Sequence, residues 1–211
     1  MRLTAVFETW HLGDGNYPPL HVGQTVNLSF EMLPYALLEA SSNDVSKFER
    51  LTDAEYRFVG KVLKTYGSGN EQIAVLQAED FRFYINSFPE GARSMKEGDS
   101  VKGHGRLLLD HYVWVEFLSS YKEPPDLFYP LSVTRIRSVK IPQSFITRYE
   151  HGKAYPASLS HNEYSAADIQ TLERMQDSKG DEAFFLVDFE GSYIRTAKIP
   201  LTFLGPSAPS L

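Results

Sequence analysis

The prediction of a mainly β fold starts from the stretch Tyr56-Arg57-Phe58-Val59-Gly60-Lys61-Val62-Leu63-Lys64-Thr65-Tyr66. This stretch is rich in aromatic and β-branched residues, as β-strands are, and it leads into the turn sequence Gly67-Ser68-Gly69-Asn70. Four further strands, each bounded by turn residues, are predicted at 72–77, 81–85, 101–109 and 111–117. Five strands within about 65 residues indicate a small barrel or sandwich.

Parts of this segment resemble an OB-type barrel: Gly60-Lys61-Val62, Phe81 to Ile85, and Gly98 to Leu107. Interior glycines suit a strand that bends sharply around a barrel. The resemblance implies an oligonucleotide or oligosaccharide bound on the face of the second and third strands. Phe81 and Phe83 are expected in the core, because alternate residues of a barrel strand face inward. The predicted ligand-binding residues of this segment are Lys61, Lys64, Arg82, Tyr84 and Arg106, with Arg82 and Tyr84 expected to be the more exposed.

The N-terminal part of the sequence also contains strand patterns. Residues 3–10 are predicted as a strand, and residues 25–32 alternate cleanly, with Val26, Leu28, Phe30 and Met32 on one face. Residues 39–55 are polar and acidic. They are predicted to connect two β units through a short helix that begins after Asn43 or Asp44, or else to form a linker.

The C-terminal part is predicted to differ. A helix is expected from Ser165, because Ser165 followed by Asp168 is similar to a capping box, and Gly180 would end it. Strands at 183–189 and 192–204 flank Glu190-Gly191 and indicate a hairpin. The predicted fold is therefore mainly β, with small barrel or sandwich units, one C-terminal helix and a terminal β-hairpin. The predicted domains are an N-terminal β unit with a polar connector (1–55), an OB-like barrel unit (56–142), and a helix plus hairpin packed on the barrel (143–211).

Two sequence echoes occur within the chain. Val22-Gly23-Gln24-Thr25-Val26 resembles Glu97-Gly98-Asp99-Ser100-Val101, which indicates either a shared turn or a duplicated β unit. Ile136 to Pro142 also resembles Ile194 to Pro200. This second echo indicates either two edge strands that leave the sheet in the same way at a proline, or two symmetric sets of basic residues that bind an anionic partner. The second alternative adds four predicted ligand-binding residues: Arg137, Lys140, Arg195 and Lys198.

Composition and charge narrow the function. The 211 residues contain no cysteine, so thiolate metal sites, disulfides and cysteine nucleophiles are excluded. The net charge is -6, made up of -5 over residues 1–55, +2 over residues 56–142 and -3 over residues 143–211. Phosphate neutralisation dominates nucleic-acid binding, so this balance disfavours a general nucleic-acid binder. The sequence contains no run of 18 apolar residues, so no membrane-spanning helix is predicted. A cytoplasmic location without membrane association is expected.

No catalytic motif stands out. The six histidines lack metal-ligand spacing, and neither a G-x-S-x-G elbow nor a phosphate loop occurs. No catalytic residue, metal or cofactor is therefore predicted, although an enzyme with a scattered site stays an alternative. The sequence predicts a non-catalytic binding protein, for example an acidic inhibitor or immunity-type protein with a basic protein partner. The alternative is an OB-like barrel that binds a single-stranded oligonucleotide or an oligosaccharide.

Overall fold

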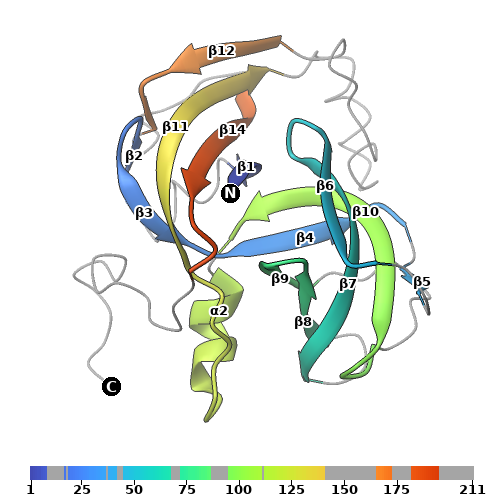
Figure 1. Cartoon of the computed structure of the whole chain (residues 1–211). Coiled ribbons are helices and arrows are strands. Elements are labelled where there is room, and N and C mark those ends of the chain that lie inside the picture. Colours follow the sequence, from blue (N-terminus) through green and yellow to red (C-terminus); the bar gives the residue numbers. More distant parts are fainter. Residues whose placement is uncertain are drawn as a thin grey trace, which may run out of the picture.

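A computed structural model of the chain shows a mainly β fold with one short α-helix among the residues it describes (Figure 1). It describes residues 1–8, 17, 19–36, 38–41, 45–67, 72–86, 95–110, 112–140, 165–172 and 182–194, and only the backbone of 182 and 183. No helix in these ranges is long and apolar enough to cross a bilayer. The elements are β1 (Arg2–Glu8), β2 (Leu20–His21), β3 (Thr25–Leu28), β4 (Phe30–Pro34), β5 (Glu39–Ala40), β6 (Lys47–Thr52), β7 (Glu55–Tyr66), β8 (Ile73–Ala78), β9 (Phe81–Ile85), β10 (Ser100–Leu109), α2 (Tyr112–Glu116), the 3-10 turn η2 (Leu118–Ser120), β11 (Tyr129–Lys140), β12 (Ser165–Ile169), β13 (Thr171–Leu172) and β14 (Glu182–Gly191).

Five strands close the small barrel that the sequence predicts. The pairing runs β7–β8–β9–β4–β10 and returns from β10 to β7. Four of these strands are those predicted within residues 56–109. The fifth is β4, which precedes them in the chain and pairs in parallel with β9 through Glu31 and Tyr84. We call this ring the first barrel.

The strand predicted at 111–117 is wrong, because residues 112–116 form α2. The side chain of Asp110 accepts a hydrogen bond from the Tyr112 amide at 2.6 Å, so the first amide of the helix has a partner. Val113 and Trp114 are both buried although they are adjacent. A strand would have pointed these two side chains to opposite faces.

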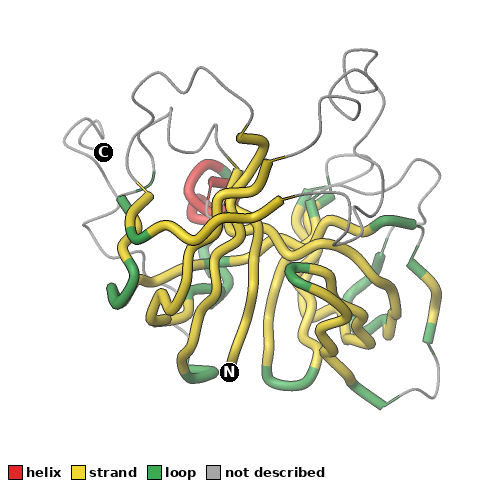
Figure 2. The backbone as a smooth tube through the Cα atoms, turned by 90° about the horizontal axis from the view of Figure 1, so that it is seen from above, coloured by secondary structure: helices red, strands yellow, loops and turns green. Residues whose placement is uncertain are grey.

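A second ring of strands lies beside the first barrel (Figures 1 and 2). Its pairing runs β11–β14–β1–β10–β4, and β3, which precedes β4 by one residue, pairs back to β11. The two rings therefore share β10 and β4. One parallel pair occurs in each ring, β4 with β9 in the first and β1 with β10 in the second.

The first sequence echo lies at equivalent places in the two rings. Gly23 and Gly98 both have a φ of +90°, which favours glycine, and they begin the approaches to β3 and β10. The Gly23 amide donates to the Val133 carbonyl at 2.7 Å, and the Gly98 amide donates to the Val62 carbonyl at 2.9 Å. A strand irregularity follows each of these valines. The two turns are therefore equivalent in backbone geometry and pairing, as both the shared turn and the duplicated β unit predict.

Aromatic side chains fill the core. Phe30, Phe81 and Tyr129 are fully buried with ring centroids 5.2–6.3 Å apart, and Phe83 is buried beside them, as expected for the inward face of β9. Gly105 allows β10 to cross β4 closely, since a Cβ there would lie 2.3 Å from the Leu33 carbonyl oxygen. The two rings are therefore joined by side-chain packing as well as by shared strands.

Tertiary pairing overrides three local predictions. Residues 47–52 form strand β6 rather than part of a helix or linker, because they pair with β7. Residues 165–169 form strand β12 rather than a helix start, because they cover the free edge of β11, and Asp168 binds Arg135 instead of capping. The turn is also not at Glu190-Gly191, since these are the last two residues of β14 and pair with β1 and β11. Residues 42–44, 173–180 and 195–204 lie outside the described residues.

Candidate functional site

Three of the predicted binding residues lie on the outside of the first barrel. Lys61 of β7 is in register with Gln77 of β8, which is in register with Arg82 of β9. Arg82 donates to the Gln77 side-chain oxygen at 2.9 Å and also bonds Asp126. Lys64, further along β7, lies 3.9 Å from the Glu123 carboxylate and 5.4 Å from the centre of the Tyr66 ring. Acidic partners thus offset part of this positive charge.

Tyr84 is fully buried, so its predicted exposure is wrong. Its side chain leaves the barrel interior, but it packs in a second cluster with Val75, Trp114 and Phe128. The segment around α2 covers this outer face of the barrel. Sequence alternation could place Tyr84 outside the barrel, but it could not show that a later segment would cover it.

The same covering segment carries exposed aromatic side chains on its other side. Tyr112 is 37 % exposed, Phe117 55 % and Tyr121 43 %. α2 extends away from the two rings in Figure 1. We call residues 112–121 the aromatic projection.

Buried contacts hold the aromatic projection in place. Val113, Trp114 and Leu118 are buried in the second cluster. The indole N–H of Trp114 donates to the Pro125 carbonyl at 2.9 Å, and Tyr121 packs edge-on against Tyr66 at 4.7 Å. The exposed rings are therefore presented on a fixed support. The sequence did not reveal them, because the strand predicted at 111–117 makes Tyr112 and Phe117 part of the barrel wall, and Tyr121 follows that range.

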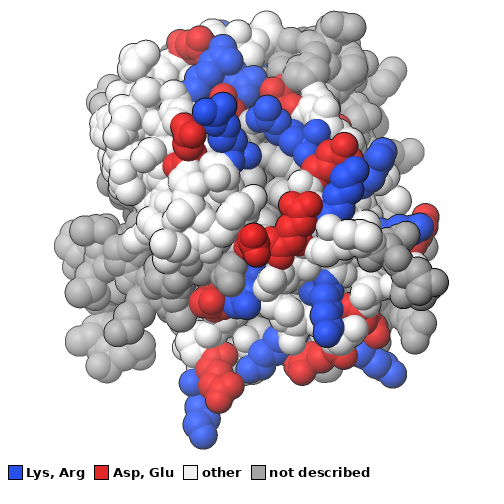
Figure 3. All heavy atoms as spheres, in the orientation of Figure 1, with Lys and Arg blue, Asp and Glu red and all other residues white. Residues whose placement is uncertain are grey.

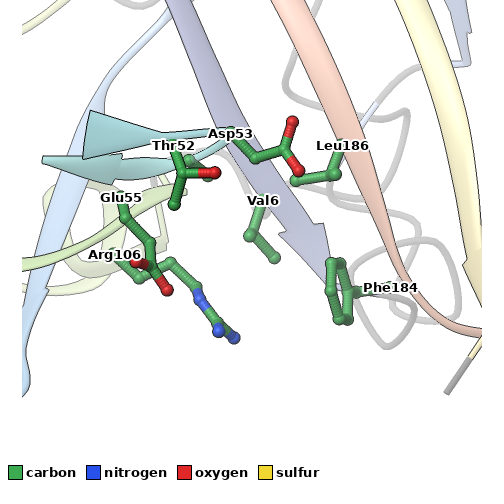
Figure 4. Close-up of a pocket in the computed structure, with 8 residues that line it drawn as sticks. Val6, Thr52, Asp53, Glu55, Arg106, Phe184 and Leu186 are labelled. Carbon is green, nitrogen blue, oxygen red and sulfur yellow. The ribbon is translucent and has the colours of Figure 1, made fainter. Parts of the chain in front are cut away.

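A small crevice brings Arg106 together with the turn between β6 and β7 (Figure 4). Its walls are residues 52–55 of that turn, Val6 of β1, and Phe184 and Leu186 of β14. The crevice is partly open to solvent. The crevice lies where the first barrel contacts the outer face of the second ring.

Arg106 is 9 % exposed and lies between two aromatic side chains. Its guanidinium lies 5.9 Å from the centre of the Tyr35 ring and 5.6 Å from that of Phe184. Its Nε donates to the Tyr35 hydroxyl at 3.2 Å, and that hydroxyl donates to Glu55 Oε1 at 2.9 Å. Burial raises the pKa of Tyr35 to about 12, so the hydroxyl stays protonated.

Arg137 lies beside the crevice in an ion network rather than on a free surface. Its Nη1 is 2.8 Å from Asp53 and its Nη2 is 3.1 Å from Asp188, and all three side chains are largely buried. The Thr4 hydroxyl donates to Asp188 at 2.6 Å and accepts from Arg50 at 2.9 Å. This network ties the turn of the first barrel to strands of the second ring.

The second sequence echo is only partly described. Its first copy lies in β11, which pairs with both β12 and β14, so the edge-strand interpretation is wrong for this copy. As predicted, Arg137 and Val139 face one way, while Ile136 faces the main core. Lys140 is exposed at the strand end, and Arg195 and Lys198 lie outside the described residues.

Acidic and basic side chains are interspersed on the face shown in Figure 3, with no broad patch of one sign. Within the described ranges, no group of three or more His, Asp or Glu side chains is arranged to hold a metal ion.

Comparisons of the chain with protein-family models, curated proteins and solved structures found no match.

Proposed function

We propose that the protein is a non-catalytic binding protein of the cytoplasm that contacts a basic protein partner through the aromatic projection. The observation that carries the proposal is the exposure of Tyr112, Phe117 and Tyr121 on a segment whose other side is buried. Aromatic residues are enriched at protein interfaces and supply much of their binding energy. Rings that are already fixed before binding lose little conformational freedom on association.

Charge supports a basic partner. Residues 110–126 contain four acidic side chains and one lysine, and the whole chain carries a net charge of -6. Asp126 and Glu123 are partly offset by Arg82 and Lys64, whereas Glu116 is exposed within the projection. Opposite charge accelerates association and disfavours acidic partners. An inhibitor or immunity-type protein that binds a basic nuclease or toxin is one form of this function.

The test compares capture by two variants. Tyr112→Ser/Phe117→Ser removes two exposed rings and leaves the buried Val113, Trp114 and Leu118, and the contact of Tyr121 with Tyr66, in place. Val45→Ser/Leu51→Ser removes two exposed apolar side chains near and on β6 and serves as the matched control. Immobilised proteins are incubated with host lysate, and captured proteins are identified by mass spectrometry.

We expect the parent protein and the control to retain the same basic protein, and the projection variant to lose at least tenfold of it. Purified partner should then bind the parent protein less tightly as salt is raised, since part of the attraction is electrostatic. Equal capture by both variants, or capture of an acidic partner alone, would contradict the proposal.

A second candidate, oligonucleotide binding, is favoured by the row Lys61, Gln77 and Arg82 across three adjacent strands. The burial of Tyr84 weakens it, because base stacking needs an exposed ring. Titration with a fluorescent single-stranded oligothymidylate at low salt distinguishes the two candidates. Saturable binding that Lys61→Gln/Arg82→Gln abolishes would favour the second candidate, and its absence would favour the first.

A further inference from the structure

We infer that the crevice beside Arg106 is a binding site for a carboxylate group. This inference does not rest on the proposed function, since the crevice and the aromatic projection consist of different residues. Arg106 provides the recognition: it is nine-tenths buried and its guanidinium lines the crevice. Figure 4 shows the guanidinium projecting into the space between Glu55 and Phe184.

The bonding of Arg106 leaves donors for a ligand. Within the described part of the chain, its guanidinium makes one hydrogen bond, from Nε to the Tyr35 hydroxyl, and no ion pair within 4 Å. Its terminal nitrogens are reached by solvent, so a ligand can approach them. The planar fork of an arginine matches the two oxygens of a carboxylate.

The neighbouring groups prepare the guanidinium for such a ligand. The rings of Tyr35 and Phe184 flank it, and the Tyr35 hydroxyl holds Nε. This leaves the terminal nitrogens as the donors nearest the open space. A side chain already fixed in its bound geometry loses little entropy when the ligand arrives.

The acidic residues around the crevice limit the charge of the ligand. Asp53 is 2.8 Å from Arg137, which offsets its charge. Glu55 lines the same space and is bonded to the Tyr35 hydroxyl, so one negative charge faces the ligand. A dianionic phosphate would bring a second negative charge with no second cation to pair it, which is costly at a largely buried site.

The test titrates the intact chain with sodium acetate, sodium phosphate and sodium chloride at constant ionic strength. The Nε–Hε signal of Arg106 is followed by nuclear magnetic resonance and is assigned by its loss in Arg106→Lys. We expect a saturable shift with acetate and a Kd of roughly millimolar magnitude for a single ion pair. Phosphate should bind more weakly, and chloride should give no saturable shift.

Two variants and one control make the test decisive. Arg106→Lys, followed through neighbouring amide signals, should weaken acetate binding at least tenfold, because lysine lacks the planar fork. Glu55→Gln should tighten it several-fold, because the repelling charge is removed while an acceptor for Tyr35 is kept. Arg57→Lys, at an exposed arginine of β7, should leave binding unchanged. The gain expected from Glu55→Gln cannot arise from misfolding.

A further comparison identifies the source of the carboxylate. N-acetyl-glutamic acid amide represents a side chain of a polypeptide, and acetate represents a small free acid. Tighter binding of the blocked glutamate assigns the site to a protein carboxylate, and tighter binding of acetate assigns it to a free acid. The inference is overturned if neither gives a saturable shift, if phosphate binds more tightly than both, or if Arg106→Lys retains the parent affinity.

Discussion

Replacing Arg137 with methionine should destabilise the protein strongly, because the change leaves two buried carboxylates without their cation. Methionine keeps most of the length of the side chain and removes its charge. Arg137 lies 2.8 Å from Asp53 and 3.1 Å from Asp188, and the three side chains are 13 %, 15 % and 23 % exposed. Removing one member of a buried ion pair costs about 3–5 kcal/mol.

The partial exposure of the two aspartates places the expected loss near the lower end, about 3 kcal/mol of unfolding free energy. For a chain of this size, that loss corresponds to a fall in Tm of about 6–12 °C. The assay is urea and thermal unfolding at pH 7, followed by circular dichroism, with the m-value checked for constancy.

The same strand provides a matched control. Arg135 also makes two hydrogen bonds to a carboxylate, at 2.7 and 3.1 Å from Asp168, but both side chains are more than half exposed. Arg135→Met should therefore change the Tm little, because water screens an exposed pair. Equal losses for the two variants would refute the argument that burial makes the Arg137 network strong. Adding Asp53→Asn to Arg137→Met should restore part of the lost stability, and no recovery would show that uncompensated charge is not the cause.

Two further predictions concern a buried acid and two glycines. Burial raises the pKa of Asp110 from 3.8 to about 6, so the stability that its neutral form contributes is present below pH 4 and lost as the pH rises through 6. Asp110→Asn should therefore raise the free energy of unfolding at pH 7 by on the order of 2–3 kcal/mol and make it depend less on pH between pH 4 and 7. Glu116→Gln, at an exposed acid of the same segment, should do neither. Urea unfolding at a series of pH values checks this. Gly105→Ala should cost about 3 kcal/mol, because its Cβ would lie 2.3 Å from the Leu33 carbonyl oxygen. Gly98→Ala should cost only about 1 kcal/mol, because an alanine is strained at a φ of +90° but its Cβ would have no atom within 4 Å. Equal costs for the two variants in urea unfolding would show that β10 and β4 do not approach closely at Gly105.

Local pattern predicted those parts of the fold that depend on composition and alternation. The strands at 56–66, 72–77, 81–85 and 101–109 are present, and Phe81 and Phe83 face the core as expected. The glycines of the first echo occupy equivalent turns. These features are encoded locally, because strand propensity, a two-residue period and a positive φ need no knowledge of the rest of the chain.

The candidate site was predictable only in part. The sequence singled out Arg106 and Arg137 as basic residues on strands, and the structure brings both to the same region. It did not single out Tyr35 or Glu55, which hold Arg106 from other parts of the chain. Hydrogen bonds between residues far apart in the chain leave no periodic signal in the sequence, so their partners appear only in the structure.

The high strand content, the apolar faces of the strands and the absence of cysteine can be read from the sequence alone. The pairing of the strands can be read only from the folded chain. The tertiary structure placed β4 in the first barrel, made a helix of residues 112–116, and made a strand of residues 165–169. The physical reason is that a strand edge gains its hydrogen bonds from whichever segment reaches it, and that choice depends on the whole fold. The burial of Tyr84 and the exposure of Phe117 follow from the same placement of one covering segment.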